Sequence, residues 1–482
     1  MLSAIYTDER LFLRIGLAVL AFAVLGYVYT GFLPLLVAPM LWVYVVLMLK
    51  NWKMAFWLFL FFIPLSVRFS FSGNSLSLCV PDEPMMWSFL LLGLLLYAYE
   101  PSALKGWWYL NPLVLVVICQ FIWLICSVVY STVPLLSFKF LLSKIWLLAA
   151  CFVMPIWIFR EKEDFKMAFL ILLTSVLFTI LGIFFSHSTT NFLFSDIHRA
   201  AGLFYENHVE YSSVISMFFP FIFIACLWLR DRDKRKARWM FVIACFFILA
   251  IFLSYARAAV LAVLFSFFVY YAIKKRFVHW IMPAIYGIIA LMLFYVVRNE
   301  KYLELRPNYE QTYMNWDFSE HMKATFKGRD ESSMERLYRW IAAIRMSKMK
   351  PVFGYGPHGF YYNYKIYTLR SFKTYASKNV EHSTTHNYFL YMLTEQGYPA
   401  MGLYALLNIV IFSQAQRIYH RFKDRFYKLC TMGIAMLFAA SFVNNFFSEL
   451  VDTHKVGALF FISLSLLVIL GRKSREEQNA VV

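Results

Sequence analysis

Charged residues are scarce in this chain. They make up 15% of its 482 residues, whereas a soluble domain carries roughly a quarter. The hydrophobic fraction is 61% and the mean hydropathy is +0.61. Much of the surface must therefore face lipid instead of water.

Paired cysteines are missing as well. The seven cysteines include no C-x2-C pair and six of them lie in apolar runs, which excludes a disulfide framework. The net charge of +18 would suit a nucleic-acid-binding protein, but the basic residues form short clusters between apolar runs, such as 230–238 and 274–276. Such clusters anchor membrane proteins. We therefore expect membrane lipid as a partner, and no nucleic acid.

Apolar runs long enough to cross a membrane recur along the chain. The first run lacks a convincing cleavage site, which favours a retained helix over a removed signal peptide. The pattern predicts an all-α, polytopic transmembrane bundle of about 12–14 spans. The 14 spans lie near residues 11–30, 32–49, 54–70, 85–99, 112–130, 136–159, 166–186, 209–229, 239–255, 258–273, 278–297, 386–413, 429–447 and 455–471.

Lysine and arginine are distributed unevenly between alternate loops. One set of loops carries the basic clusters, at residues 50–53, 160–162, 230–238, 274–276, 417–428 and 472–475. The opposite set is almost bare: residues 70–84 contain neither, and residues 187–208 contain only Arg199. Because basic loops stay in the cytoplasm, we expect both termini to be cytoplasmic and the bare loops to face outward.

One long polar segment, Arg298–Thr385, interrupts the spans on the outer side. Its many tyrosines argue against disorder. We expect three parts: an N-terminal transmembrane bundle (1–297, about 11 spans), a partly helical outer loop domain (298–385), and C-terminal transmembrane helices with a short tail (386–482). Within the loop, residues 334–349 should form a helix. Residues 351–356 should form a turn whose glycines allow close approach to a ligand.

Four side chains far apart in sequence are expected together at the outer face. They are Arg199, Arg257, Arg336 and His386. Charges near a membrane are costly, so they are functional candidates by default. Arginine can grip phosphate oxygens with two parallel hydrogen bonds, and it stays charged at any working pH. The set predicts a site for a doubly charged anion, with a titratable imidazole beside it.

Motifs in a fixed order surround these positions. Arg336 to Trp340 precedes Pro351 to Gly356, and His386-Asn387 is separated by nine residues from Gly397, with Gly402 beyond. In this order, and on this side of the membrane, the motifs resemble the O-antigen ligase and polymerase superfamily.

The resemblance implies a metal-independent glycosyltransferase without a cofactor in the bacterial inner (cytoplasmic) membrane, its active site facing the periplasm. The donor would be a glycan linked to undecaprenyl pyrophosphate. Arg199, Arg257 and Arg336 would bind the pyrophosphate, and His386, Arg336 and Arg257 would be the catalytic residues, with His386 activating or orienting the acceptor hydroxyl. Lys144, in the outer half of an apolar run, is expected to contact the carrier phosphate or a buried carboxylate.

The acceptor stays open between two classes. A ligase uses a sugar hydroxyl of lipid A–core, and a polymerase uses a second lipid-linked repeat unit. The single large loop favours a ligase, whereas Ala400 and Asn207-His208 depart from the ligase pattern and favour a polymerase. A transporter or flippase for lipid-linked sugars is a more distant alternative, and it predicts charges along a path through several spans instead of at one face.

Each candidate also has a purely structural alternative. Arg257 could anchor a helix hairpin, Arg336 could be an exposed charge on a loop helix, and His386 could cap the span that it precedes. Arg199 could pair with a neighbouring acid, Asp196 or Glu206.

Two other clusters are weaker. His382 and His386 have the spacing of paired metal ligands, but no Glu follows the first and no third ligand is evident, so no metal is predicted. Glu449, Asp452 and His454 could form an acid–base site, but pairing at the membrane interface is the expected role.

Overall fold

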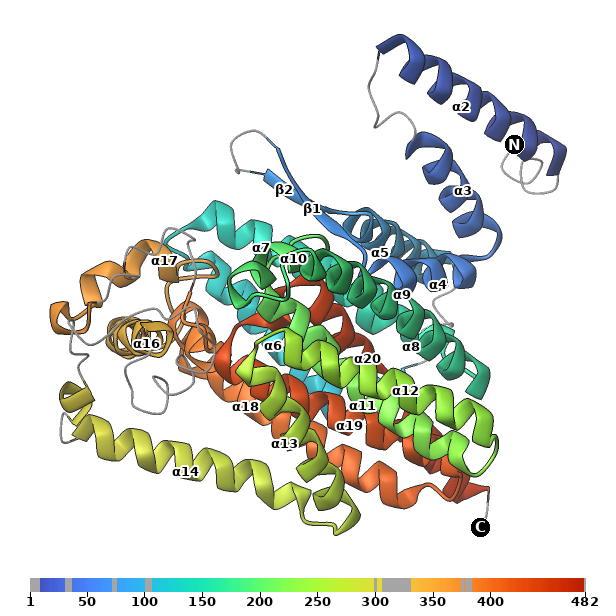
Figure 1. The fold of residues 1–482 in the computed structure, drawn as a ribbon. Coiled ribbons are helices and arrows are strands. Elements are labelled where there is room, and N and C mark those ends of the chain that lie inside the picture. The colour runs from blue at the N-terminus through green and yellow to red at the C-terminus, as the bar shows by residue number, and fades with distance from the viewer. Residues whose placement is uncertain are drawn as a thin grey trace.

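The computed structural model describes residues 9–30, 37–71, 76–99, 106–298, 301–305, 331–373, 377 and 384–480. They form an all-α bundle, as predicted, together with one β-hairpin that was not predicted (Figure 1). The first half contains α2 (Glu9–Thr30), α3 (Val37–Lys50), α4 (Trp52–Phe62), β1 (Val67–Phe71), β2 (Leu76–Val80), α5 (Asp82–Tyr99), α6 (Pro112–Val129), α7 (Pro134–Leu148), α8 (Met154–Ile158), α9 (Lys162–Ser188), α10 (Ile197–Ala201) and α11 (His208–Arg230). The second half contains α12 (Lys234–Leu253), α13 (Arg257–Lys274), α14 (Val278–Arg298), α16 (Glu331–Met349), α17 (Phe360–Asn363), α18 (Tyr388–Arg421), α19 (Arg425–Phe447) and α20 (His454–Asn479).

Each predicted span coincides with a helix, but some N-terminal helices are short. Among the described residues, 10 helices are long and apolar enough to cross a membrane. Helices α3 and α4 have 14 and 11 residues, which correspond to about 21 and 16 Å of a hydrocarbon core about 30 Å thick. The span predicted over 54–70 is wrong beyond Phe62, because the chain turns there and continues into strand β1. Strand β1 pairs antiparallel with β2.

Helices α19 and α20 lie at the centre of the bundle. In α20, 89% of the most apolar stretch is buried, compared with 17% in α14. Helix α19 packs against α11, α13, α18 and α20. Helices α2 and α3 pack on each other and project from the bundle (Figure 1). The central helices are therefore covered by other helices, whereas the peripheral helices expose apolar side chains suited to contact with lipid.

Ion pairs join the basic turns at one end of the bundle. Lys162 pairs with Asp424, and Arg425 pairs with Asp231 at 2.5 Å. These residues come from three of the turns that carry the basic clusters, so the pairs place those three turns at one end of the bundle. We call this the basic end. The opposite end, on which residues 331–373 pack, is the loop end.

Residues 331–373 have a small core of their own. Helix α16 spans Glu331–Met349, which confirms the helix predicted over 334–349. Apolar side chains on its inner face pack against aromatic side chains from the turns that follow. The buried members are Tyr338, Ile341, Ala342, Ala343, Met346, Tyr355, Phe360, Tyr364 and Phe372.

Helix α18 is broken at Gly397. This residue has φ 81° and ψ 179°, and Pro399 follows within the same helix. Proline has no N–H and its ring clashes with the carbonyl four residues earlier, so the break leaves backbone groups without helical partners. In a membrane such groups must find partners inside the protein.

Segment 351–356 of the loop occupies the break and supplies those partners. Three backbone hydrogen bonds join this segment to α18, and an indole N–H from α6 donates to one further carbonyl of α18. They run from Tyr355 N–H to Thr394 O (2.9 Å), Gly356 N–H to Glu395 O (2.8 Å), Tyr398 N–H to Pro351 O (2.9 Å) and Trp123 Nε1–H to Gln396 O (2.8 Å).

Glycines make this contact sterically feasible. A Cβ on Gly354 would lie 2.4 Å from the backbone of Glu395, and a Cβ on Gly397 would lie 2.0 Å from the Val352 carbonyl oxygen. The glycines of segment 351–356 were predicted to allow close approach to a ligand. In the structure they instead allow this segment to approach the backbone of α18 closely. The neighbouring Phe353 ring stacks between two rings of α6 and the turn after it, with centroids 5.2 Å from Trp123 and 4.3 Å from Tyr130.

Replacing Gly397 by alanine should destabilise the fold. The new Cβ would meet the Val352 carbonyl and must adopt φ 81°, so we expect Gly397→Ala to lower the free energy of unfolding by at least about 2 kcal/mol. Thermal unfolding of the purified protein in detergent measures the loss. The matched control is Gly402→Ala in the same helix, where nothing lies within 4 Å of the added Cβ. Equal melting of the two variants would contradict the interpretation.

Candidate active site

Helix α16 positions two arginines at the loop end. Arg339 is buried, and its Nε donates to Glu335 Oε1 at 3.1 Å. The other Glu335 oxygen accepts a hydrogen bond from the Ser377 hydroxyl at 2.8 Å. A buried guanidinium needs such a carboxylate, because an unpaired buried charge is strongly destabilising. The Glu335–Arg339 pair therefore fixes the face of α16 that also carries Arg336.

His386 follows a segment that α16 holds in place. Arg339 Nη1 donates to the Thr384 carbonyl at 3.2 Å, and Trp340 Nε1 donates to the Thr385 carbonyl at 2.8 Å. The two bonds connect two adjacent residues of α16 to the two residues before His386. A displacement of α16 would consequently displace the imidazole.

Asn387, the residue after His386, connects this segment to α18 and α19. Asn387 caps α18, because its Oδ1 accepts from Leu390 N–H at 3.0 Å, and its Nδ2 donates to the Phe446 carbonyl at 2.9 Å. The capping role considered for His386 thus belongs to Asn387. His386 itself has φ 51°, in the left-handed region that non-glycine residues rarely adopt. Backbone strain of this kind is concentrated at functional sites.

Burial and two nearby arginines determine the protonation of His386. Burial, together with the positive charges of Arg336 and Arg339, lowers the pKa of His386 to about 3. Its imidazole is therefore neutral near pH 7. Burial raises the pKa of Glu449 nearby, although Arg339 and Arg336 act in the opposite direction. A group of two guanidiniums and a neutral imidazole is suited to binding an anion.

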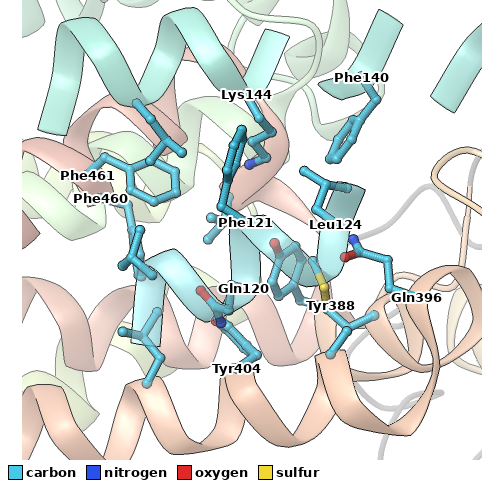
Figure 2. Close-up of a pocket in the computed structure, with 16 residues that line it drawn as sticks. Gln120, Phe121, Leu124, Phe140, Lys144, Tyr388, Gln396, Tyr404, Phe460 and Phe461 are labelled. Atoms are coloured by element: carbon cyan, nitrogen blue, oxygen red, sulfur yellow. The ribbon is translucent and has the colours of Figure 1, made fainter. Parts of the chain in front are cut away.

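Lys144 lies beside a second feature, an apolar cavity between α6, α7, α18 and α20 (Figure 2). Its Nζ pairs with Asp452 Oδ1 at 2.5 Å, and the Tyr388 hydroxyl donates to the same oxygen at 3.3 Å. The cavity has a volume of about 70 Å³. Figure 2 shows Lys144 among aromatic rings, with Gln120 and Gln396 as further polar groups. Of the two contacts predicted for Lys144, the structure shows the buried carboxylate.

Arg257 and Arg199 lie on a different group of helices. Arg257 begins α13, directly after a turn in which the Tyr255 hydroxyl donates to the Phe192 carbonyl at 2.8 Å. Arg199 is exposed on α10, which packs against α9 and α11. The contact at Phe192 therefore ties the turn of Arg257 to the segment that leads into the helix of Arg199.

The described contacts bring together one pair of the predicted site residues, Arg336 and His386. Glu206, one of the acids considered as a partner for Arg199, instead pairs with Arg68 of β1. Whether the Arg199–Arg257 group acts on the same ligand as Arg336 stays a prediction.

Glu449, Asp452 and His454, in the turn between α19 and α20, each contact a different partner. Asp452 pairs with Lys144, whereas His454 Nε2 lies 3.2 Å from Glu83 Oε1 on α5. Glu449 lies near the arginines of α16 instead. These contacts favour the expected pairing over a joint acid–base site.

One cluster in the described part of the chain has the residue types of a metal site. Ligand atoms of Cys79, Glu83 and His454 all lie within 4.8 Å of one another. However, Arg68, Lys144 and Lys455 surround His454 closely enough to act on it electrostatically, and positive charges oppose a dication. The three side chains are therefore of the types that bind metal ions, but the positive charges around them disfavour a cation at this position. The other candidate ligand, His382, lies outside the described residues.

Sequence reasoning did not identify several groups that position the site. The i, i+4 spacing of Glu335 and Arg339 could have revealed their ion pair. Glu395 had no such signal: its carboxylate accepts the backbone N–H groups of His358 at 2.7 Å and Phe360 at 3.2 Å. That contact joins segments 35 and 37 residues apart, so only the tertiary structure reveals it.

A comparison with known protein families finds a match over part of the chain. Residues 242–405 match the family described as O-antigen ligase. The matched region contains Arg257, Arg336 and His386, while Arg199 and Lys144 lie before it. No curated protein matches the chain.

The neutral state of His386 can be tested by NMR. With the pKa lowered to about 3, the imidazole of the purified, ¹⁵N-histidine-labelled protein should not titrate between pH 8 and 5 (about the range of an ordinary histidine). The signal that disappears in His386→Gln identifies the residue. Inorganic pyrophosphate, by offsetting the arginine charges, should raise the pKa of His386, while burial continues to hold that pKa below the ordinary value. Titration near pH 6.5 without pyrophosphate would contradict the geometry.

Proposed function

We propose that this chain, a member of the O-antigen ligase and polymerase superfamily, transfers a polysaccharide from undecaprenyl pyrophosphate to a sugar hydroxyl of lipid A–core. The observation that carries the proposal is the junction of Arg336, Arg339 and His386, which lies within the matched region. The basic end would face the cytoplasm, because clustered lysine and arginine remain on that side. The loop end would then face the periplasm.

In the proposed reaction the arginines bind the leaving group. Arg336, joined by Arg257 and Arg199, would hold the pyrophosphate oxygens. The acceptor oxygen attacks the anomeric carbon of the donor, the bond from that carbon to the pyrophosphate oxygen breaks, and undecaprenyl pyrophosphate leaves with the bonding electrons. Positive charge fixed in advance stabilises the charge that develops on the leaving oxygen. Lys144 would assist by sharing its charge between Asp452 and the carrier phosphate.

His386 would take the proton of the acceptor hydroxyl. An imidazole with a pKa near 3 is a weak base. Burial is the largest cause of the lowered pKa and the arginine charges add to it. When pyrophosphate binds Arg336, the contribution of the arginine charges is reduced. The imidazole would therefore be a stronger base once the donor has bound, which limits loss of the donor to water.

A ligase is favoured over a polymerase by the single large loop, whose described part packs as one small core beside the site. In a ligase this loop would face the lipid A–core sugars. A polymerase performs the same bond chemistry on a second lipid-linked repeat unit, so the two functions differ in acceptor and not in the residues named above.

Surface polysaccharide from a deletion strain, separated on a gel beside the complemented parent, tests the proposal. A ligase predicts lipid A–core without attached sugar, and full-length polymer accumulating on the carrier. Lipid A–core bearing a single repeat unit would identify a polymerase instead. Unchanged polymer in both pools would contradict both functions.

Complementation with variants tests the site. His386→Ala is expected to reduce transfer by about 10²–10⁴-fold, and Arg336→Ala should be comparably defective, with Arg336→Lys only partly active because lysine lacks the bidentate fork. The control is Arg345→Ala, since residues nine apart occupy opposite faces of α16 and Arg345 is exposed. Transfer by His386→Ala at the wild-type rate would exclude its proposed role.

A purified-protein assay separates the enzyme from a transporter. We expect transfer in detergent without any membrane gradient, at a rate that EDTA leaves unchanged, because the proposed mechanism uses arginines in place of a metal. Loss of activity on chelation would contradict metal independence. Failure of transfer with intact donor and acceptor, under conditions where the protein stays folded, would favour the transporter.

A further inference from the structure

A second apolar cavity lies at the basic end, away from the candidate active site. It is located between α9, α11, α12, α19 and α20 and has a volume of about 550 Å³. Its walls are almost entirely aromatic and aliphatic, with residues such as Phe169, Phe221 and Ile243. Protein interiors are normally close-packed, so an apolar space of this size in a membrane protein calls for an apolar occupant.

The cavity opens toward lipid between α9 and α12. Among its lining residues, Leu170 of α9 is 51% exposed and Trp239 of α12 is 65% exposed. Along α11 the lining runs from Trp228, near the basic end, to Phe218. Ten residues of helix correspond to about 15 Å, which is half of a hydrocarbon core about 30 Å thick. The cavity therefore has the depth of one leaflet.

Positive charge gathers at the mouth of this cavity. Lys166 and Lys236 are themselves lining residues, and Arg232 lies 3.7 Å from the centre of the Trp228 ring at the rim. Residues 230–238 contain six basic and two acidic side chains. In the described part of the chain, Lys234, Arg235 and Arg238 are exposed and have no ion-pair partner. Their charge remains available to an anion.

We propose that this cavity is a binding site for an anionic phospholipid of the leaflet at the basic end. One acyl chain would enter between α9 and α12, and the phosphate would lie among the cations of residues 230–238, which we call the basic rim. Apolar walls of one-leaflet depth beneath a basic rim match the two parts of such a lipid. The proposal does not depend on the reaction that the loop end performs.

Native mass spectrometry of the purified full chain tests the site. Phosphatidylglycerol and phosphatidylcholine with identical acyl chains are added in turn, and the bound fraction of each is compared. The wild-type protein should prefer phosphatidylglycerol. Neutralising the basic rim with Lys234→Gln, Arg235→Gln and Arg238→Gln together should reduce that preference by at least about tenfold, while binding of phosphatidylcholine changes little.

A matched control removes the same charge elsewhere at the basic end. Lys274→Gln, Lys275→Gln and Arg276→Gln together neutralise three exposed cations of the α13–α14 turn, outside the cavity. This variant should keep the wild-type preference. An equal loss in both triple variants would mean that the lipid responds only to overall surface charge, and would overturn the proposal. An unchanged preference in the rim variant would overturn it as well.

Filling the cavity tests the acyl-chain part separately. Ala225→Phe adds a ring at the cavity wall and should reduce binding of both lipids, whereas Val242→Phe enlarges an exposed side chain of α12 that does not line the cavity and should reduce neither. Circular dichroism and size-exclusion chromatography show whether each variant is folded. Should Ala225→Phe fail to fold, the rim comparison still decides the proposal. Undiminished lipid binding by folded Ala225→Phe would contradict the cavity as the site.

Discussion

Helix α18 breaks at Gly397, and segment 351–356 supplies the hydrogen bonds that the break removes. Pro399 leaves the Glu395 carbonyl without its helical donor, and Gly356 N–H takes that place at 2.8 Å. The exchange fixes the loop to a helix of the bundle through backbone atoms, with glycines where side chains would collide. Helix α16, which directly precedes this segment, is thereby placed against the start of α18.

This placement creates the electrostatics of the site. Arg336 and Arg339 come from α16, and His386 comes from the segment before α18, so they meet only because the loop is seated in the break. Burial, together with two positive charges beside the imidazole, keeps it neutral. A pyrophosphate group bound there would reduce the contribution of those charges and make His386 a stronger base. Binding of the donor and activation of the acceptor would then be coupled by charge.

The two ends of the bundle have different tasks in this account. At the loop end, the Glu335–Arg339 pair holds the arginine that contacts the segment before His386, and the Lys144–Asp452 pair lies beside an apolar cavity. At the basic end, pairs such as Arg425–Asp231 join turns whose remaining cations face the membrane surface. The same excess of lysine and arginine that indicates orientation in the sequence also forms the basic rim of the proposed lipid site.

The sequence alone determined the fold class and the approximate positions of the long apolar helices, because these follow from hydropathy over about 20 residues. Through a family resemblance it also predicted Arg336 and His386 as site residues. It could not show that α4 ends at Phe62, since an apolar run reads alike as helix or strand. Only the tertiary structure decided that Arg339 joins the site, that Asn387 is the cap and that Lys144 meets Asp452. These contacts join residues distant in the chain, and their partners depend on how the broken α18 packs, which no local pattern encodes.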